Sequence, residues 1–381
     1  MAMSDHFFQE EHRFFRAVIR RWFEENIVPH VDTWEHQKSF PRELYQQVGQ
    51  AGFLSIGFPE ESGGAGGDLF HMIVLTEELI RTGSAGLAAS LGSLGIAAPP
   101  IVRGGTEEQK RRWLPRIFSG EWIAALAVTE PDTGSDVANI RTRAVREGDH
   151  YVVTGSKTFI TSGTRADFLT TVVRTGGDGF GGVSLLGIET NSPGFTVNRN
   201  LEKMGWHASD TAELSFDEVR VPVENLIGPE NGGFGILMQN FVGERLILAI
   251  MAVEQAQLAF ESCRSYCDER RAFGRTLAGF QVTRHKLAEM ATSIDVARIY
   301  NYMVAQRYLA GEMVIREVCQ AKNNSTDMAC KVIDQAVQLH GGYGYMREYL
   351  VERLYRDVRI LPIGGGTREI MNEVISKQLG L

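Results

Sequence analysis

The middle of the chain constrains the fold most, because short segments rich in β-branched residues follow one another there with no helical pattern between them. WIAALAVTE begins at Trp122, HYVVTGSKTFIT, DFLTTVVRT and GVSLLGIE follow, and AELSFDEVRVP ends at Pro222. Clusters of Gly, Asp, Asn and Pro separate these segments, as expected for strands joined by turns. A parallel sheet needs long crossover connections, usually helices, so this stretch predicts an antiparallel sheet and disfavours a Rossmann nucleotide domain.

Helical patterns flank this region on both sides. Residues 1–121 read as helices with short breaks, and Thr106-Glu107-Glu108-Gln109 is a capping box that predicts the start of one of them. After residue 231 apolar residues recur at helical spacing, first at Leu246, Ile250 and Val253. Further helices are expected around 287–297, 315–339 and 368–379. The predicted fold is α+β and multidomain: an N-terminal helical domain (1–121), a middle antiparallel β domain (122–230) and a C-terminal four-helix bundle (231–381).

Charge and composition narrow the classes of partner. The formal net charge is -8, whereas nucleic acid and anionic membranes require a concentrated positive surface. We therefore expect neither as a partner, and with no signal or transit pattern at the N-terminus we expect a cytoplasmic, bacterial-type protein. Cys263 and Cys267 are one helical turn apart, but no companion pair stands at zinc-finger spacing. They are interpreted as core residues, and no metal site is predicted.

Two segments of the predicted sheet suggest a polar cofactor. LAVTEPDTGSD, residues 126–136, leaves a strand into a loop with hydroxyls and free amides. In GSKTFITSGT, residues 155–164, a hydroxyl follows an aromatic residue at strand spacing, so both side chains share one face. This spacing is compatible with a ring stacked on Phe159 and hydrogen-bonded by Thr161. The alternative is that Phe159 is an ordinary core residue of the sheet.

Six segments, taken in order, resemble the flavin-dependent acyl-CoA dehydrogenases across essentially the whole chain. They are AVTEPDTGSD, KTFITSG, DTAELSFDEVRVP, RRAFGRTLAGFQ, QLHGGYGYMREY and IGGGTREIM. The bundle half is most similar to the long-chain members, and the IGGGT loop to the isovaleryl members. The resemblance implies FAD bound between the β domain and the bundle, and a homotetramer.

The resemblance also implies which residues contact FAD. Around the isoalloxazine it places Leu126, Ala127, Val128, Thr129, Gly134, Ser135, Phe159, Ile160 and Thr161. Residues implied to reach the FAD of a neighbouring subunit are Arg270, Phe273, Gln281, Gln338, Leu339, His340, Gly341 and Gly342. Thr367, Arg368 and Glu369 are implied to contact FAD as well.

The position of the catalytic base is the most specific implication. Many members carry a glutamate directly before the Gly-Thr of the terminal loop, where this chain has Gly365. Long-chain and isovaleryl members instead carry the base in a Glu-Arg pair on a bundle helix, which matches Glu244-Arg245. Gly365 is implied to keep its backbone N–H as an oxyanion donor. The alternative for Glu244 is an acidic residue in the first turn of a helix that opens near residue 241, where the helix dipole favours negative charge.

Substrate contacts are implied for Ser135, Phe241, Arg245, Gly364 and Gly366. The three glycines 364–366 suggest room for a bulky or 3-methyl-branched acyl group, or else merely shape a turn, and Arg245 is alternatively an ion-pair partner. The predicted activity is formation of a trans-2,3-enoyl-CoA from a medium-chain, long-chain or branched acyl-CoA, with an electron-transferring flavoprotein as acceptor. The alternatives are a thioester oxidase or flavin monooxygenase of the same fold, a carrier-protein thioester as substrate, and a catalytically silent binding subunit.

Overall fold

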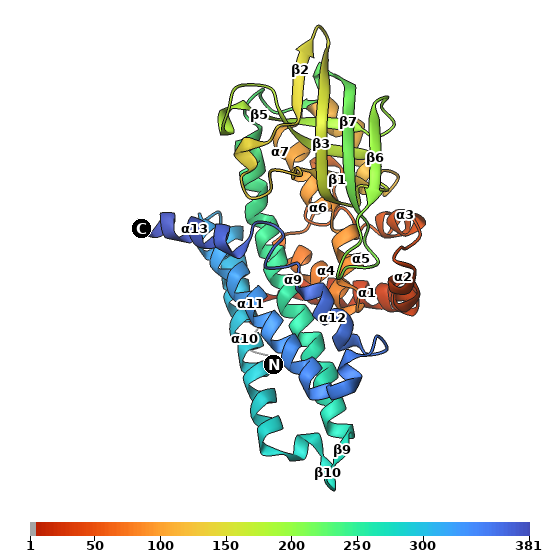
Figure 1. Cartoon of the computed structure of the whole chain (residues 1–381), viewed down its shortest axis with the longest axis vertical. Coiled ribbons are helices and arrows are strands. Elements are labelled where there is room, and N and C mark those ends of the chain that lie inside the picture. Colours follow the sequence, from red (N-terminus) through yellow and green to blue (C-terminus); the bar gives the residue numbers. More distant parts are fainter. Residues whose placement is uncertain (1–4) are drawn as a thin grey trace.

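The computed structural model describes residues 5–381 and shows an elongated molecule with the sheet at one end and the long helices at the other (Figure 1). The N-terminal helices pack beside the junction of the two. These helices are α1 (Glu10–Asn26), α2 (Val31–Gln37), α3 (Glu43–Gln50), α4 (Leu69–Arg81), α5 (Ala85–Leu91), α6 (Leu94–Ala97), α7 (Pro99–Gly104) and α8 (Glu107–Phe118). The predicted capping box is formed: the Thr106 hydroxyl accepts from Gln109 N, and Thr106 N donates to the Gln109 side chain, at the start of α8.

The middle region forms one twisted sheet in the order β6-β7-β3-β2-β4-β5-β8, with β1 paired to β4. Its strands are β1 (Ala124–Ala127), β2 (Arg143–Glu147), β3 (His150–Thr161), β4 (Phe168–Arg174), β5 (Val183–Glu189), β6 (Phe195–Asn200), β7 (Thr211–Pro222) and β8 (Leu226–Ile227). Most neighbours are antiparallel, as predicted. The prediction is wrong for β1 and β4, which run parallel, and for the single parallel bridge between β2 and β4. The chain reverses direction in the β2–β3 hairpin. Strand β4 can therefore run parallel to β1 and β2 without a crossover helix.

Strands β4 and β5 form the two-sided centre of the sheet. Phe168 and Val172 face the main helical core, whereas Leu169 and Val173 face a second cluster on the opposite side of the sheet. Trp113 of α8 packs on Phe168 with ring centroids 4.9 Å apart and covers the first face. Both strands are accordingly buried at every residue but the last, rather than at alternate residues.

The C-terminal region is built around α9 (Gly233–Glu269), which packs closely against α11 (Ile315–His340), α10 (Gln281–Leu309) and α4. The chain reverses after α9 through the short β9 (Arg271–Ala272) and β10 (Arg275–Thr276), at the end of the molecule opposite the sheet (Figure 1). Helices α12 (Leu350–Val358) and α13 (Arg368–Leu379) complete the region. Helix α12 was not predicted from the sequence, although LVERLYRDV is amphipathic and buries Val351, Leu354 and Val358.

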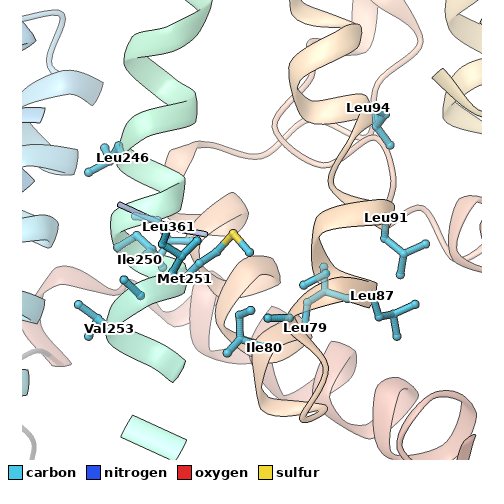
Figure 2. Packing of buried hydrophobic residues seen from close by; sticks show 14 of the residues in the cluster. Leu79, Ile80, Leu87, Leu91, Leu94, Leu246, Ile250, Met251, Val253 and Leu361 are labelled. Carbon is cyan, nitrogen blue, oxygen red and sulfur yellow. The ribbon is translucent and has the colours of Figure 1, made fainter. Parts of the chain in front are cut away.

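Helix α9 is long and apolar enough, by length and composition, to cross a membrane, and half of that stretch is buried inside the protein. Met251 and its neighbours on α9 pack towards Leu79, Leu87 and Leu91 of the N-terminal helices (Figure 2). Cys263 and Cys267 lie in the same core and are fully buried. Packing on several sides accounts for the apolar character of α9.

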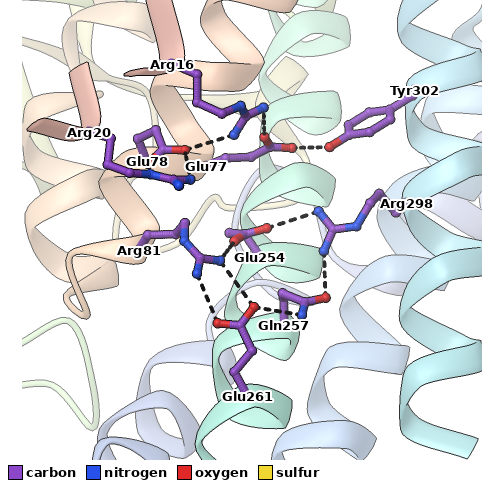
Figure 3. A network of polar contacts seen from close by, with 10 residues as sticks. All are labelled: Arg16, Arg20, Glu77, Glu78, Arg81, Glu254, Gln257, Glu261, Arg298 and Tyr302. Carbon is purple, nitrogen blue, oxygen red and sulfur yellow. Dashed lines mark hydrogen bonds and ion pairs between the residues drawn. The ribbon is translucent and has the colours of Figure 1, made fainter. Parts of the chain in front are cut away.

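A charged network ties the N-terminal helices to the bundle (Figure 3). The Glu254 carboxylate of α9 is buried and pairs with Arg81 of α4 at 2.7 Å and with Arg298 of α10 at 3.1 Å. One turn before Arg81, the buried Glu77 accepts from the Tyr302 hydroxyl of α10. Because buried carboxylates are costly unless paired, these contacts fix the relative position of α4, α9 and α10.

Candidate active site

Glu244 lies well inside α9, against the terminal glycine loop. The helix begins at Gly233, so Glu244 stands about three turns from its N-terminus. The interpretation of Glu244 as a first-turn residue is therefore wrong, since the dipole effect is confined to the first turn. A Cβ atom placed on Gly365 would lie 3.3 Å from Glu244 Oε1 and 2.4 Å from Leu248 Cδ1. The two positions at which the family resemblance puts a base thus share one small volume.

The environment of Glu244 favours its protonated form. Its Oε2 atom is buried and has no hydrogen-bond partner among residues 5–381. Burial raises the pKa of the Glu244 carboxyl to about 7, while the positive charges of Arg245 and Lys322 act in the opposite direction. A carboxyl with one buried, unpartnered oxygen and a raised pKa has the properties expected of a general base.

The terminal loop is held by two cations from different helices. Gly365 and Gly366 have φ values of +64° and +96°, which glycine adopts without steric cost. The Arg245 guanidinium donates from Nε to the Gly365 carbonyl at 3.2 Å, and the Lys322 ammonium donates to the Gly366 carbonyl. Arg245 is buried, and its hydrogen bond anchors the loop. This role differs from both sequence interpretations, a substrate contact and an ion-pair partner.

The other predicted substrate positions differ in what they contact. The Phe241 ring lies one turn before Arg245, with the guanidinium 5.6 Å from its centroid. A Cβ on Gly364 would meet only Ile360, at 3.6 Å or more, whereas one on Gly366 would lie 2.7 Å from Met371 Cε. Ser135 is exposed on the loop that follows β1.

The β domain supplies an aromatic side chain in an unusual conformation. Phe159 is 66% exposed, so its interpretation as sheet core is wrong. Its φ of +60° falls at an irregularity in the pairing of β3 with β7, between Lys157 and Ile160. Left-handed backbone is rare for an aromatic residue, and strain of this kind concentrates at ligand sites. An exposed ring, the half-buried Thr161 and the exposed residues 134–135 fit a flat, polar cofactor.

A buried ion pair holds the strand end beneath Phe159. Lys157 is fully buried and donates to Glu130 Oε1 and to the Val128 carbonyl, both at 2.8 Å. Glu130 also accepts from Arg141 N and Thr142 N, at 2.6 and 2.9 Å. These contacts fix the segment Leu126, Ala127, Val128 and Thr129 relative to Phe159. The pair was not predicted from the sequence.

The remaining predicted FAD contacts lie elsewhere in the molecule. Arg270 follows the last residue of α9, so it stands about 39 Å along the helix axis from Glu244. Phe273 is 96% exposed at the β9–β10 turn, and Gln281 is exposed at the start of α10 (Figure 1). One chain therefore does not bring these residues to the site at Glu244, and their role towards a neighbouring subunit stays a prediction.

A cavity of about 470 Å³ lies at this far end. It is lined by Tyr266, Arg270, Leu277, Leu339, His340, Gly341, Gly342, Tyr343 and Met346. Gln338 is exposed on the last turn of α11. The His340 ring is buried, stacks on Tyr266 and has Nδ1 2.8 Å from the Ala336 carbonyl, so it is engaged in packing.

Residues 367–369 form the start of α13. The Thr367 hydroxyl caps this helix by accepting from Ile370 N at 3.3 Å, and Arg368 pairs with Asp327 at 2.7 Å. Glu369 is exposed. The capping residue follows directly on Gly366, so the glycine loop leads into a helix N-terminus.

Among residues 5–381, the side chains that could together hold a metal ion are Glu11, His12 and His71. The two histidines have another explanation. His12 Nδ1 accepts from Gln9 N at 3.0 Å, and Asp68 Oδ1 lies 3.0 Å from His12 Nε2 and 2.9 Å from His71 Nδ1. Asp68 caps α4, so the cluster serves the starts of two helices.

Comparison with known proteins agrees with this geometry. Family models match along the chain: the acyl-CoA dehydrogenase N-terminal domain at residues 9–121, the middle domain at 125–219 and the C-terminal domain at 231–380. The chain belongs to the acyl-CoA dehydrogenase family. Enzymes of this family are FAD-dependent oxidoreductases, and a tetramer is typical of them.

Individual relatives cover nearly the whole chain. The long-chain specific mitochondrial acyl-CoA dehydrogenase of Rattus norvegicus is 40% identical over 98% of this chain and 87% of its own. A probable acyl-CoA dehydrogenase from Mycobacterium abscessus is 53% identical, with a TM-score of 0.97 over 98% of this chain and 100% of its own. A glutaryl-CoA dehydrogenase from Mycobacterium smegmatis in complex with FADH2 is 28% identical, with a TM-score of 0.93 over 99% and 96% of the two chains. The predicted three-domain fold is confirmed.

Proposed function

We propose that the protein desaturates an acyl-CoA between the α and β carbons, with Glu244 as the base that removes the α proton. The observation that carries this proposal is the unpartnered, buried Oε2 of Glu244 beside Gly365. The α proton of a thioester is only weakly acidic, so the base must hold a proton well at working pH. A carboxyl beside the apolar Leu248 side chain meets that demand, because desolvation disfavours its charged form.

The terminal loop is proposed to stabilise the charge that develops on the thioester oxygen. A backbone N–H fixed before the reaction contributes about 3 kcal/mol to the transition state, and Gly365 offers one next to Glu244. The absence of a side chain at Gly365 leaves room for Glu244 and Leu248. Glu244 on the helix would thus act as the base, and the Gly365 N–H on the loop would stabilise the oxyanion. In other members one residue of the terminal loop provides both functions.

FAD is proposed to lie between β3 and α9, with Leu126 to Thr129, Gly134, Ser135 and Phe159 to Thr161 around its ring system. When bound, the cofactor accepts the hydride that leaves the β carbon. Thr367 to Glu369 would contact it from the start of α13. Arg270, Phe273, Gln281 and Gln338 to Gly342 would reach the cofactor of another copy in a homotetramer.

The substrate is proposed to be a medium-chain, long-chain or 3-methyl-branched acyl-CoA. Gly364 faces only Ile360, which leaves space beside the glycine loop, and Ser135, Phe241, Arg245 and Gly366 would line the thioester and acyl path. The proposed electron acceptor is an electron-transferring flavoprotein.

Flavin bleaching under anaerobic conditions tests the proposal. Wild-type protein mixed with a panel of straight and branched acyl-CoAs should lose its yellow colour with at least one of them. Glu244→Gln should retain FAD and fold but bleach at least about 1000-fold more slowly, because its shape is kept and the proton acceptor is lost. Undiminished bleaching by Glu244→Gln would refute the assignment. Rapid reoxidation by oxygen would favour an oxidase, and protein that never takes up FAD would favour a silent binding subunit.

A further inference from the structure

Lys322 is a buried lysine that the proposed chemistry does not yet use. It lies in the middle of α11, on the face that also buries Cys319, Ser325 and Ala329, and its side chain has no exposed surface. Burying an ammonium group is unfavourable unless partners compensate, and burial lowers the pKa of Lys322 to about 8. A lysine retained at such a position needs an explanation in its contacts.

Its hydrogen bond fixes the glycine loop from the side of α11. Lys322 Nζ donates to the Gly366 carbonyl, and Arg245 Nε donates to the adjacent Gly365 carbonyl. On the other side of the loop, Gly364 N donates to the Ile360 carbonyl at 2.8 Å. Consecutive glycines restrain their own backbone weakly, so the direction of the Gly365 N–H depends on these anchors.

The Lys322 side chain and the proposed base also both lie near the position that a Cβ atom on Gly365 would take. A Cβ on Gly365 would be 3.3 Å from Glu244 Oε1 and 3.8 Å from Lys322 Cε, so the two side chains flank one point. The ionisable groups that act on Lys322 are Glu244 and Arg245 of α9 and Cys319 of its own helix. The loop residues 363–366 carry no charge. Among residues 5–381, the cations that act on Glu244 are Arg245 of its own helix and Lys322 of α11.

We infer that Lys322 is a positioning residue of the active site: it anchors the loop that presents the Gly365 N–H and supplies positive charge beside the Glu244 carboxylate. This inference rests on the proposed role of Glu244. Without the ammonium group, the loop loses one of its two carbonyl anchors. The carboxylate form of Glu244 also loses a favourable partner, so the base retains its proton to higher pH.

Lys322→Met tests both parts, because it keeps the length and apolar stem of the side chain and removes the charge. The infrared absorption of the protonated Glu244 carboxyl, assigned by its loss in Glu244→Gln, is titrated against pH in the purified protein. We expect the midpoint to rise by about one pH unit or more in Lys322→Met. The acid limb of kcat/KM should move by the same amount, and kcat at its optimum should fall about 10- to 100-fold.

Matched variants separate positioning from general loss of structure. Lys322→Arg restores a positive charge and should return the Glu244 midpoint towards wild type. Lys203→Met removes a half-buried lysine, which donates to the Ser209 carbonyl, and should leave the Glu244 midpoint unchanged. Lys322→Gln replaces Lys322→Met for all measurements if the methionine variant does not fold.

The outcomes distinguish this inference from the proposed function. If Glu244→Gln is inactive and the Glu244 midpoint and kcat are unaltered in Lys322→Met, the inference is overturned while the base assignment stands. If Glu244→Gln keeps full turnover, the base assignment itself fails. A midpoint that moves equally in Lys322→Met and Lys203→Met would show general loosening of the fold and would also overturn the inference.

Discussion

Substitution of Gly365 by alanine is expected to damage both stability and turnover. The residue has a φ of +64°, and left-handed backbone costs a residue with a Cβ about 1–2 kcal/mol. The new Cβ would lie 2.4 Å from Leu248 Cδ1, an overlap that must be relieved by movement, and overpacking of this kind costs about 1–3 kcal/mol. The combined penalty is about 2–5 kcal/mol.

Calorimetry and turnover measure this penalty separately. For a cooperative unit of the size of the C-terminal region, the penalty corresponds to a fall in the unfolding midpoint of at least about 4 °C. Displacement of the Gly365 N–H should in addition slow turnover about 100- to 1000-fold, the usual cost of losing one oxyanion donor. Both effects should appear in protein that still contains FAD.

Gly364→Ala is the matched control for stability. It adds the same methyl group one residue earlier, where φ is not left-handed and the nearest atom, Ile360 O, is 3.6 Å away. Its unfolding midpoint should stay near that of wild type. Leu248→Ala combined with Gly365→Ala should be less destabilising than the sum of the two single changes by at least about 1 kcal/mol, because the overlap is removed. A Gly365→Ala enzyme with wild-type midpoint and turnover would refute the described packing of the loop against α9.

Three further predictions concern charge and backbone strain. Glu244 has a folded-state pKa of about 7 against an ordinary 4.5, so its contribution to stability is lost as pH rises through 7; Glu244→Gln should gain stability relative to wild type between pH 5 and pH 8 in denaturant titrations. Phe159→Gly should relieve strained backbone and leave the unfolding midpoint of the flavin-free protein equal to or above wild type, but release FAD faster on dilution; unchanged FAD retention would remove Phe159 from the cofactor site. Arg298→Met should destabilise by about 1.5–3 kcal/mol because the buried Glu254 loses one of its two arginine partners and keeps Arg81, whereas Arg21→Met, at an exposed pair, should leave the midpoint unchanged.

Much of the architecture can be predicted from the sequence because its apolar and β-branched residues recur at regular spacing. The β-branched run from Trp122 to Pro222 and the apolar spacing after residue 231 reflect the faces that each element buries. The parallel pairing of β1 with β4 was not predictable, because register between distant strands depends on contacts rather than on local pattern. Helix α12 is short and lies between two glycine-rich segments, which obscure the helical spacing of its apolar residues.

Some residues of the candidate site were likewise predictable from the sequence, whereas others depend on tertiary structure. The contact between Glu244 and Gly365 was expected only through the family resemblance, since no local pattern joins a helix to a loop so far along the chain. The left-handed backbone of Phe159 depends on a strand irregularity that composition does not reveal. Lys322 did leave a signal: it is a lysine at a position of α11 where the helical spacing calls for a buried residue.

The length of α9 determines whether two inactivating substitutions, each in a different copy of the chain, would compensate for one another. Glu244 and Arg270, which are proposed to serve one site, lie about seven turns apart along this helix, so under the proposal a complete site would draw them from two copies. A copy lacking Glu244 and a copy altered at Arg270 would each be inactive alone, yet a mixed assembly would contain some sites with both parts intact. Partial recovery of turnover on mixing and reassembling two dead variants would be the mark of a shared cofactor, and dilution would abolish activity before it unfolds the subunits.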